Sequence, residues 1–281
     1  MKKNILMGVM NVTPNSFSDG DEYKDQQLSL SKIKSFLKFD SSILDLGAES
    51  TAPFNDPISF TEEWTRLDSF ISSNIEEVKK FTCVSIDTYK TQTILAFLDK
   101  YHSVFDSILW NDVSGDYEGA LEVLQRFPNI SYVLSHNLSP KRSLVCDHMN
   151  YLSEDILSSI ISFFNDGKEF FEINQIESDR IYLDPCFGFS KTKEQNYLLL
   201  KKFSSYKHLS NKWLIGVSRK SFLQSLSSEE LKESKISDSE FFHVVILSDL
   251  MKMNSNEMIF RIHDPRVFKK ALDSQIFKID S

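Results

Sequence analysis

Along the chain, short apolar segments alternate with longer segments in which apolar residues recur at helical spacing. The short segments predict eight strands: Ile5–Met10, Ser42–Leu46, Cys83–Ile86, Ser107–Trp110, Ile130–Leu134, Ile181–Leu183, Trp213–Val217 and Glu257–Ile262. The longer segments predict the intervening helices: Leu28–Phe39, Thr61–Lys79, Thr91–Lys100, Tyr117–Gln125, Tyr151–Phe171, Lys193–Phe203, Asp238–Lys252 and Pro265–Leu272. The strand segments are continuously apolar, which is typical of parallel strands covered on both faces.

Eight strand–helix repeats in 281 residues favour a closed barrel. We predict an α/β protein with a (β/α)8 TIM barrel, a fold that typically needs about 250 residues. An open doubly wound sheet that binds a dinucleotide fits less well, because no Gly-x-Gly-x-x-Gly motif follows the first strand. No linker or low-complexity segment marks a boundary, so we expect residues 1–281 to form a single domain. The polar stretch Ser225–Ser239 is interpreted as an insertion in the seventh repeat.

The charge balance narrows the class of partner. The chain has 32 Lys and Arg against 40 Asp and Glu, a net charge of −8, which argues against a nucleic-acid or anionic-membrane surface. A small anionic substrate remains compatible, because a few local cations suffice to bind one. With 12% aromatic residues, the chain is also unlike a disordered protein.

The cysteines and the apolar run near the N-terminus indicate where in the cell the protein is expected. The three cysteines (Cys83, Cys146 and Cys186) are odd in number and far apart, which suits a reduced protein better than a disulfide framework or a zinc site. The apolar run Ile5–Met10 is too short for a secretion signal or a membrane span. We therefore expect a soluble, cytoplasmic protein without membrane association.

Polar side chains follow every predicted strand. The eight strand ends carry, in order, Asn11–Gly20, Asp45–Thr51, Asp87–Lys90, Asn111–Gly115, Ser135–Asn137, Asp184–Phe189, Ser218–Ser221 and Arg261–Asp264. One such segment alone could be a turn or a helix cap. Eight are harder to explain in this way, since each polar group buried without a partner costs about 1–3 kcal/mol. In a TIM barrel these ends form one face, so the pattern predicts an active site there.

The segments at these strand ends resemble the signatures of one enzyme family. Met7–Gly20, Asp45–Thr51, Ser85–Thr88, Asn111–Gly115, Asp184–Phe189, Ser218–Ser221 and Arg261–Asp264 are similar, in this order, to the motifs of dihydropteroate synthases. The resemblance extends from residue 7 to residue 264. It implies a transferase of folate biosynthesis that joins 6-hydroxymethyl-7,8-dihydropterin diphosphate to p-aminobenzoate and releases diphosphate, with Mg²⁺ as cofactor. It also allows for a homodimer.

The resemblance further implies roles for individual residues. It implies that the pterin is bound by Asp87, Asn111, Asp184 and Lys220, and the diphosphate by Asn11, Thr51, Arg261 and His263. It implies that p-aminobenzoate is bound by Thr51, Pro53 and Ser221, and Mg²⁺ by Asn11. The implied catalytic residues are Asp87, Lys220, Arg261 and His263.

The residue chemistry agrees with these roles. A pterin presents a guanidine-like edge of N–H donors that a carboxylate can accept in a fork. A carboxylate at Asp87 would also stabilise positive charge that develops on the methylene as diphosphate leaves. Arg261 and His263 alternate along a strand and so share one face. The amide oxygen of Asn11 is a hard ligand suited to Mg²⁺.

Other interpretations stay open at this stage. Asp87 could cap the third helix, and Arg261 could pair with a carboxylate in the barrel wall. Where the family usually has Arg and Gly, this chain has Ala52 and Cys186. Arg66 and Lys24 are candidates to replace that Arg. The alternative function is a related protein that binds a pterin without this activity, either a non-catalytic binder or a pterin-dependent methyltransferase.

Overall fold

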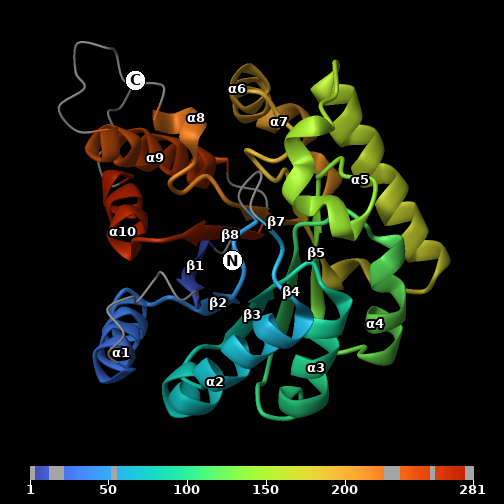
Figure 1. Cartoon of the computed structure of the whole chain (residues 1–281). Coiled ribbons are helices and arrows are strands. Elements are labelled where there is room, and N and C mark those ends of the chain that lie inside the picture. The colour runs from blue at the N-terminus through green and yellow to red at the C-terminus, as the bar shows by residue number, and fades with distance from the viewer. Residues whose placement is uncertain (1–3, 13–21, 52–55, 225–234, 254–256, 276–281) are drawn as a thin grey trace.

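The computed structural model describes residues 4–12, 22–51, 56–224, 235–253 and 257–275, without the side chains of 22–26, 224 and 235–238. Eight parallel strands pair in chain order, and β1 pairs with β8, which closes the sheet (Figure 1). The strands are β1 (Asn4–Asn11), β2 (Ile43–Gly47), β3 (Cys83–Asp87), β4 (Ile108–Asp112), β5 (Ser131–Ser135), β6 (Ile181–Asp184), β7 (Lys212–Ile215) and β8 (Glu257–Ile262). The predicted TIM barrel is therefore confirmed.

Helices surround the barrel, and α9 and α10 lie side by side (Figure 1). The α-helices are α1 (Glu22–Lys38), α2 (Phe60–Val78), α3 (Thr91–Tyr101), α4 (Leu121–Arg126), α5 (Ile156–Ile173), α6 (Lys193–Lys201), α7 (Phe203–Tyr206), α8 (Ser221–Gln224), α9 (Lys235–Lys252) and α10 (Pro265–Ser274). Short 3₁₀ helices are η2 (Glu118–Ala120), η3 (Arg142–Asn150), η4 (Ser178–Arg180) and η5 (Lys207–Leu209).

Local capping residues fix where several helices begin. Ser59 caps α2 by accepting from the Glu62 N–H, and Thr192 and Gln195 form a reciprocal capping box at α6. Asp155 accepts from the Ser158 N–H and starts α5 at Ile156. The predicted start of this helix at Tyr151 is therefore wrong, because apolar spacing alone does not reveal a cap.

Two layers of apolar side chains fill the molecule. Alternate strand residues point to opposite faces of a sheet. In β1, Ile5 and Met7 belong to a cluster that also contains Leu109, Val133 and other residues of the remaining strands, as expected for the interior of a barrel. Leu6 and Met10, the alternate residues of β1, pack in the larger cluster that includes the helices.

Candidate functional site

Strand alternation places a polar layer directly above the apolar barrel interior. Along each strand, the residue two positions after an interior residue points to the same side. Two positions after Ile43, Leu109, Tyr182 and Ile259 of the interior cluster come, respectively, Asp45, Asn111, Asp184 and Arg261. The same sequence periodicity that builds the barrel interior therefore also delivers the polar groups of its mouth.

A cavity of about 910 Å³ opens at this mouth, and most of the predicted site residues line it. Those that line it are Asn11, Thr51, Asp87, Lys220, Ser221, Arg261 and His263. Asn111 and Asp184 are more deeply buried, at 1% and 6% exposure. Pro53, Ala52 and Lys24 fall outside the residues or side chains that the structure describes. The lining residues thus come from five strand ends and from segments more than 200 positions apart.

Arg261 and two carboxylates form the centre of the polar layer. Arg261 Nε donates to Asp45 Oδ2 at 2.6 Å, and its Nη2 donates to Asp87 Oδ2. Burial would lower the pKa of Arg261, but the two carboxylates raise it above its usual value. The sequence left open an Arg261–carboxylate pair, and such a pair is present while Arg261 also lines the cavity. The third helix has Lys90 at its N-cap position, so Asp87 does not cap it.

Asp45 is a site residue that the sequence analysis did not assign a role. Its side chain is fully buried, and its Oδ1 accepts from Ser85 Oγ at 2.6 Å. Asn111 Nδ2 also approaches the same carboxylate, at 3.3 and 3.4 Å. Its position along the strand could have indicated a role, because Asp45 follows Ile43 by two residues in β2 and so points to the same side.

Asn111 and Asp184 carry buried acceptors in the same polar layer. Asn111 Oδ1 is buried and has no hydrogen-bond partner among the described residues. Asp184 Oδ1 accepts from the Cys186 N–H at 2.7 Å. Burial raises the pKa of Asp184 to about 6, although that hydrogen bond and nearby lysines oppose the shift. Burial likewise raises the pKa of Asp87, to about 7, and Arg261 opposes it.

A half-buried lysine, Lys220, and a buried one, Lys191, lie beside the loop after β6. Lys220 Nζ lies 4.6 Å from the Phe189 ring centroid, and burial lowers the pKa of Lys220. The sequence analysis missed Lys191, which donates to the carbonyl oxygens of His136, Cys186 and Phe189 at 2.8, 3.2 and 2.7 Å. The ammonium group of Lys191 thus donates three hydrogen bonds to backbone carbonyls at one point of the cavity wall.

The remaining predicted residues occupy the rim. Asn11 is exposed at the end of β1. His263 Nδ1 lies 3.1 Å from Ser218 Oγ, and burial together with neighbouring cations lowers the pKa of His263 to about 2. His263 is therefore neutral near pH 7. Among the described residues, no three His, Cys, Asp or Glu side chains gather as a metal site. Asn11 is a candidate Mg²⁺ ligand, because Mg²⁺ commonly keeps waters and phosphate oxygens and takes few protein ligands.

A second polar cluster fixes the strand ends around Glu49. Glu49 Oε1 accepts from the Ile58 N–H and the Tyr89 hydroxyl, each at 3.0 Å, and the carboxylate pairs with Lys90. Arg66 donates to the Ala48 carbonyl at 3.0 Å and pairs with Glu62. It is therefore already engaged at the end of β2.

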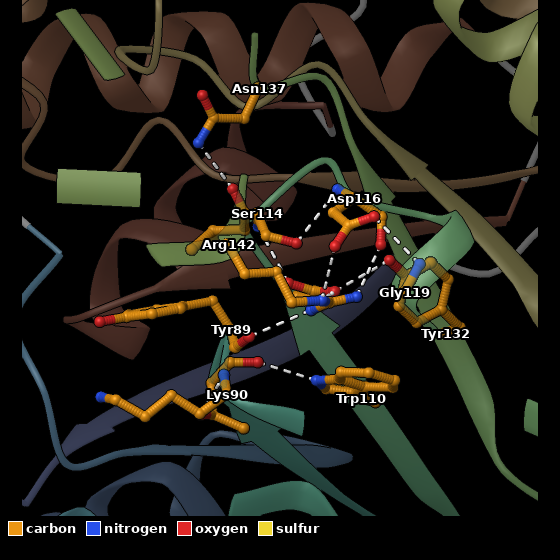
Figure 2. Close-up of polar contacts among 12 residues, drawn as sticks. Tyr89, Lys90, Trp110, Ser114, Asp116, Gly119, Tyr132, Asn137 and Arg142 are labelled. Carbon is orange, nitrogen blue, oxygen red and sulfur yellow. Dashed lines mark hydrogen bonds and ion pairs between the residues drawn. The ribbon is translucent and has the colours of Figure 1, made fainter. Parts of the chain in front are cut away.

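Figure 2 shows a third cluster, centred on Arg142 of η3. Arg142 Nη1 donates to Asp112 Oδ2 at 2.6 Å and to the Tyr89 carbonyl at 3.0 Å, while Nη2 donates to the Asp116 carbonyl at 2.6 Å. Its guanidinium carbon lies 5.2 Å from the Trp110 ring centroid. One side chain thus ties the segment after β5 to the loops after β3 and β4.

Comparison with known proteins identifies the family. The chain belongs to the pterin binding enzyme family, whose model matches residues 7–259. Its relatives include dihydropteroate synthases. The chain is 31% identical to the dihydropteroate synthase of Clostridium beijerinckii, over 79% of this chain and 77% of the relative. It is 28% identical to that of Neisseria meningitidis serogroup C, over 95% of this chain and 90% of the relative.

Solved structures of dihydropteroate synthases have the same fold as this chain. A Clostridium difficile dihydropteroate synthase in the presence of pteroic acid superposes with a TM-score of 0.78 at 26% identity, covering 98% of this chain and 97% of that one. A Xanthomonas albilineans enzyme with 4-aminobenzoic acid gives 0.77 at 25% identity, covering 99% and 94%. Within its described residues, the chain has no helix that is long and apolar enough to cross a membrane.

Proposed function

We propose that this chain is a dihydropteroate synthase. It joins a pterin methyl diphosphate to p-aminobenzoate: the amine nitrogen bonds to the methylene carbon, the carbon–oxygen bond to diphosphate breaks, and the amine loses a proton. The carrying observation is a cavity lined by Asp87, Arg261 and His263, with Asn111 and Asp184 buried in the same polar layer of the barrel. Membership of the family and the dihydropteroate synthase relatives support the same assignment.

In this proposal the buried acceptors of Asp184 and Asn111 bind the pterin. The ionised carboxylate of Asp184 accepts from the amino and ring N–H groups, and the unpartnered Oδ1 of Asn111 accepts a further N–H. The ammonium of Lys220 donates to the ring acceptors on the opposite edge. Asn111 Oδ1 thereby gains a hydrogen-bond partner.

Asp87 and Arg261 respond to charge that changes during the reaction. As diphosphate leaves, positive charge develops on the pterin methylene, and the preorganised Asp87 carboxylate stabilises it. Arg261, held by Asp45, donates to the departing diphosphate, together with the neutral imidazole of His263 and the Thr51 hydroxyl. Asn11 would hold Mg²⁺, which would supply further neutralisation of the diphosphate charge.

The second substrate enters at the rim. Thr51 and Ser221 line the cavity from opposite loops, and Pro53 follows Thr51 along the chain. We assign these residues to p-aminobenzoate.

The three cysteines are free, which supports a reducing, cytoplasmic location. A homodimer stays a prediction, which sedimentation at several concentrations tests.

A product assay tests the function. Purified protein, pterin diphosphate, p-aminobenzoate and Mg²⁺ should yield dihydropteroate and diphosphate in equal amounts. Asp184→Ala should abolish pterin binding, whereas Arg261→Ala should weaken diphosphate binding and spare the pterin. Arg126→Ala, which removes an exposed partner of Asp99, is the control and should turn over like the parent. Tight pterin binding without product would overturn the proposal in favour of a non-catalytic binder, and transfer of a methyl group would favour a methyltransferase.

A further inference from the structure

Glu49 is a nearly buried carboxylate that lines the cavity, and the proposed function gives it no role. Its side chain is 4% exposed, and it comes two positions before Thr51 in the chain. Glu49 Oε1 accepts from the Ile58 N–H at 3.0 Å. The two residues are nine positions apart, so this hydrogen bond holds together the two ends of the segment that contains Thr51.

Two consecutive residues after β3 hold the Glu49 carboxylate. The Tyr89 hydroxyl donates to Oε1 at 3.0 Å, and Lys90 Nζ pairs with Oε2. Burial and the charge of Glu49 raise the pKa of Tyr89, so its hydroxyl stays protonated and remains a donor. Arg142 donates to the Tyr89 carbonyl at 3.0 Å, which fixes the backbone at this point (Figure 2). Glu49 is therefore attached to a segment that is itself held in place.

Lys90 does not depend on Glu49 for a counter-charge. Its Nζ also lies 3.2 Å from Glu63 Oε2, and the Glu63 side chain, on α2, is 1% exposed. Thr93 Oγ1 donates to the same oxygen at 2.7 Å. Two buried carboxylates thus share one ammonium, although burying a second charge is costly. Since Glu63 already neutralises Lys90, what Glu49 adds is a pair of hydrogen-bond acceptors at the end of β2.

Holding both ends of this segment bears mainly on the second substrate. Thr51 is half-buried, lines the cavity and is assigned above to p-aminobenzoate and to the diphosphate. Ordering a segment when a ligand binds lowers the affinity, and a segment that is already tied in place costs less to order. Pterin diphosphate has further partners on other strands, among them Asp184 and Arg261. p-Aminobenzoate depends more strongly on the rim that includes Thr51.

We propose that Glu49 is a positioning residue for the second substrate: it accepts from the Ile58 N–H, is anchored by Tyr89 and Lys90, and so keeps Thr51 in the cavity wall where p-aminobenzoate binds. This proposal rests on the proposed function and extends it to a residue that acts through Thr51. It predicts that the hydrogen-bonding reach of the side chain at position 49 matters more than its charge.

Two substitutions separate reach from charge. Glu49→Gln removes the charge but keeps an oxygen that can accept from the Ile58 N–H. Glu49→Asp keeps the charge but is one methylene shorter and falls short of that N–H. With saturating pterin diphosphate, we expect Glu49→Asp to raise the KM for p-aminobenzoate about 10-fold and Glu49→Gln to stay within about 3-fold of the parent. The KM for pterin diphosphate should change by less than about 2-fold in either variant.

Glu76 of α2 supplies a matched control, because its side chain is 84% exposed and lies 3.9 Å from Lys79. Glu76→Asp and Glu76→Gln should leave both KM values and the Tm unchanged. A parent that makes no dihydropteroate would refute the proposed function itself. With an active parent, equal KM values for p-aminobenzoate in Glu49→Asp and Glu49→Gln, or a lower Tm at parent KM values, would refute the positioning role of Glu49.

Discussion

Arg261 Nε donates to Asp45 Oδ2 at 2.6 Å, and this contact joins β8 to β2 beneath the cavity. The Asp45 carboxylate is fully buried and accepts from Ser85 as well. Arg261 reaches Asp87 from this fixed position. Asp45 therefore acts as a positioning residue: it orients the guanidinium that faces the cavity, without lining the cavity itself.

Asp45→Asn should weaken both stability and turnover. The substitution leaves the half-buried guanidinium with one carboxylate fewer, so we expect a loss of about 2 kcal/mol in unfolding free energy. We also expect at least a 10-fold lower kcat, because Arg261 is no longer held toward the leaving group. Urea unfolding and steady-state kinetics measure the two effects. Asp99→Asn, in an exposed pair with Arg126, should change neither, and an equally stable Asp45→Asn enzyme would contradict this role.

Pterin affinity should depend on pH through Asp184. Its pKa is raised to about 6 by burial, and only the ionised carboxylate can accept two pterin N–H groups. Binding should therefore be tightest above pH 7 and weaken about tenfold per unit as pH falls below 6. Isothermal titration between pH 5 and 8 tests this, and affinity independent of pH across that range would exclude the titration of Asp184.

The same shift predicts that Asp184→Asn stabilises the protein. An acid whose folded-state pKa is raised from 3.8 to about 6 destabilises the fold at higher pH, because the charged form is disfavoured there. The Asn variant should thus be about 3 kcal/mol more stable than the parent at pH 8. This advantage should shrink as pH falls through 6 toward 4. Thermal unfolding at pH 5 and pH 8 measures it, and an equal Tm difference at both pH values would contradict the linkage.

Lys191→Met should loosen the loop after β6. Three carbonyl oxygens lose the ammonium that they share, so we expect a loss of about 3 kcal/mol in unfolding free energy. Because this loop carries Phe189, the KM for pterin diphosphate should also rise. Lys201→Met on the exposed side of α6 is the matched control and should leave both quantities unchanged. A stable Lys191→Met protein with parent kinetics would mean that the loop holds its shape without these bonds.

Cys186 shows how this chain accommodates a departure from the family pattern. Its φ of 52° lies in the left-handed region, and its side chain is buried near Tyr89 and Val113. Cys186→Gly relieves the strain but loses packing, so stability should change by less than about 1 kcal/mol and activity should persist. Cys186→Val should lose about 2 kcal/mol, since a β-branched residue is poorly tolerated there. Denaturation of both variants tests this order, and the reverse order would contradict the backbone argument.

The sequence by itself determined the barrel and the content of its mouth. Because side chains alternate along a strand, Asp45, Asn111, Asp184 and Arg261 share a side with the interior residues two positions before them. Seven predicted site residues line one cavity, because the ends of all parallel strands meet at one face of a TIM barrel. Which of these side chains pair with one another was decided only by the tertiary structure. The contact of Arg261 with Asp45 depends on barrel closure, and the position of Lys191 depends on a loop held by hydrogen bonds between distant segments. Local periodicity carries no information about such contacts, because a loop takes its shape from the groups that satisfy its backbone.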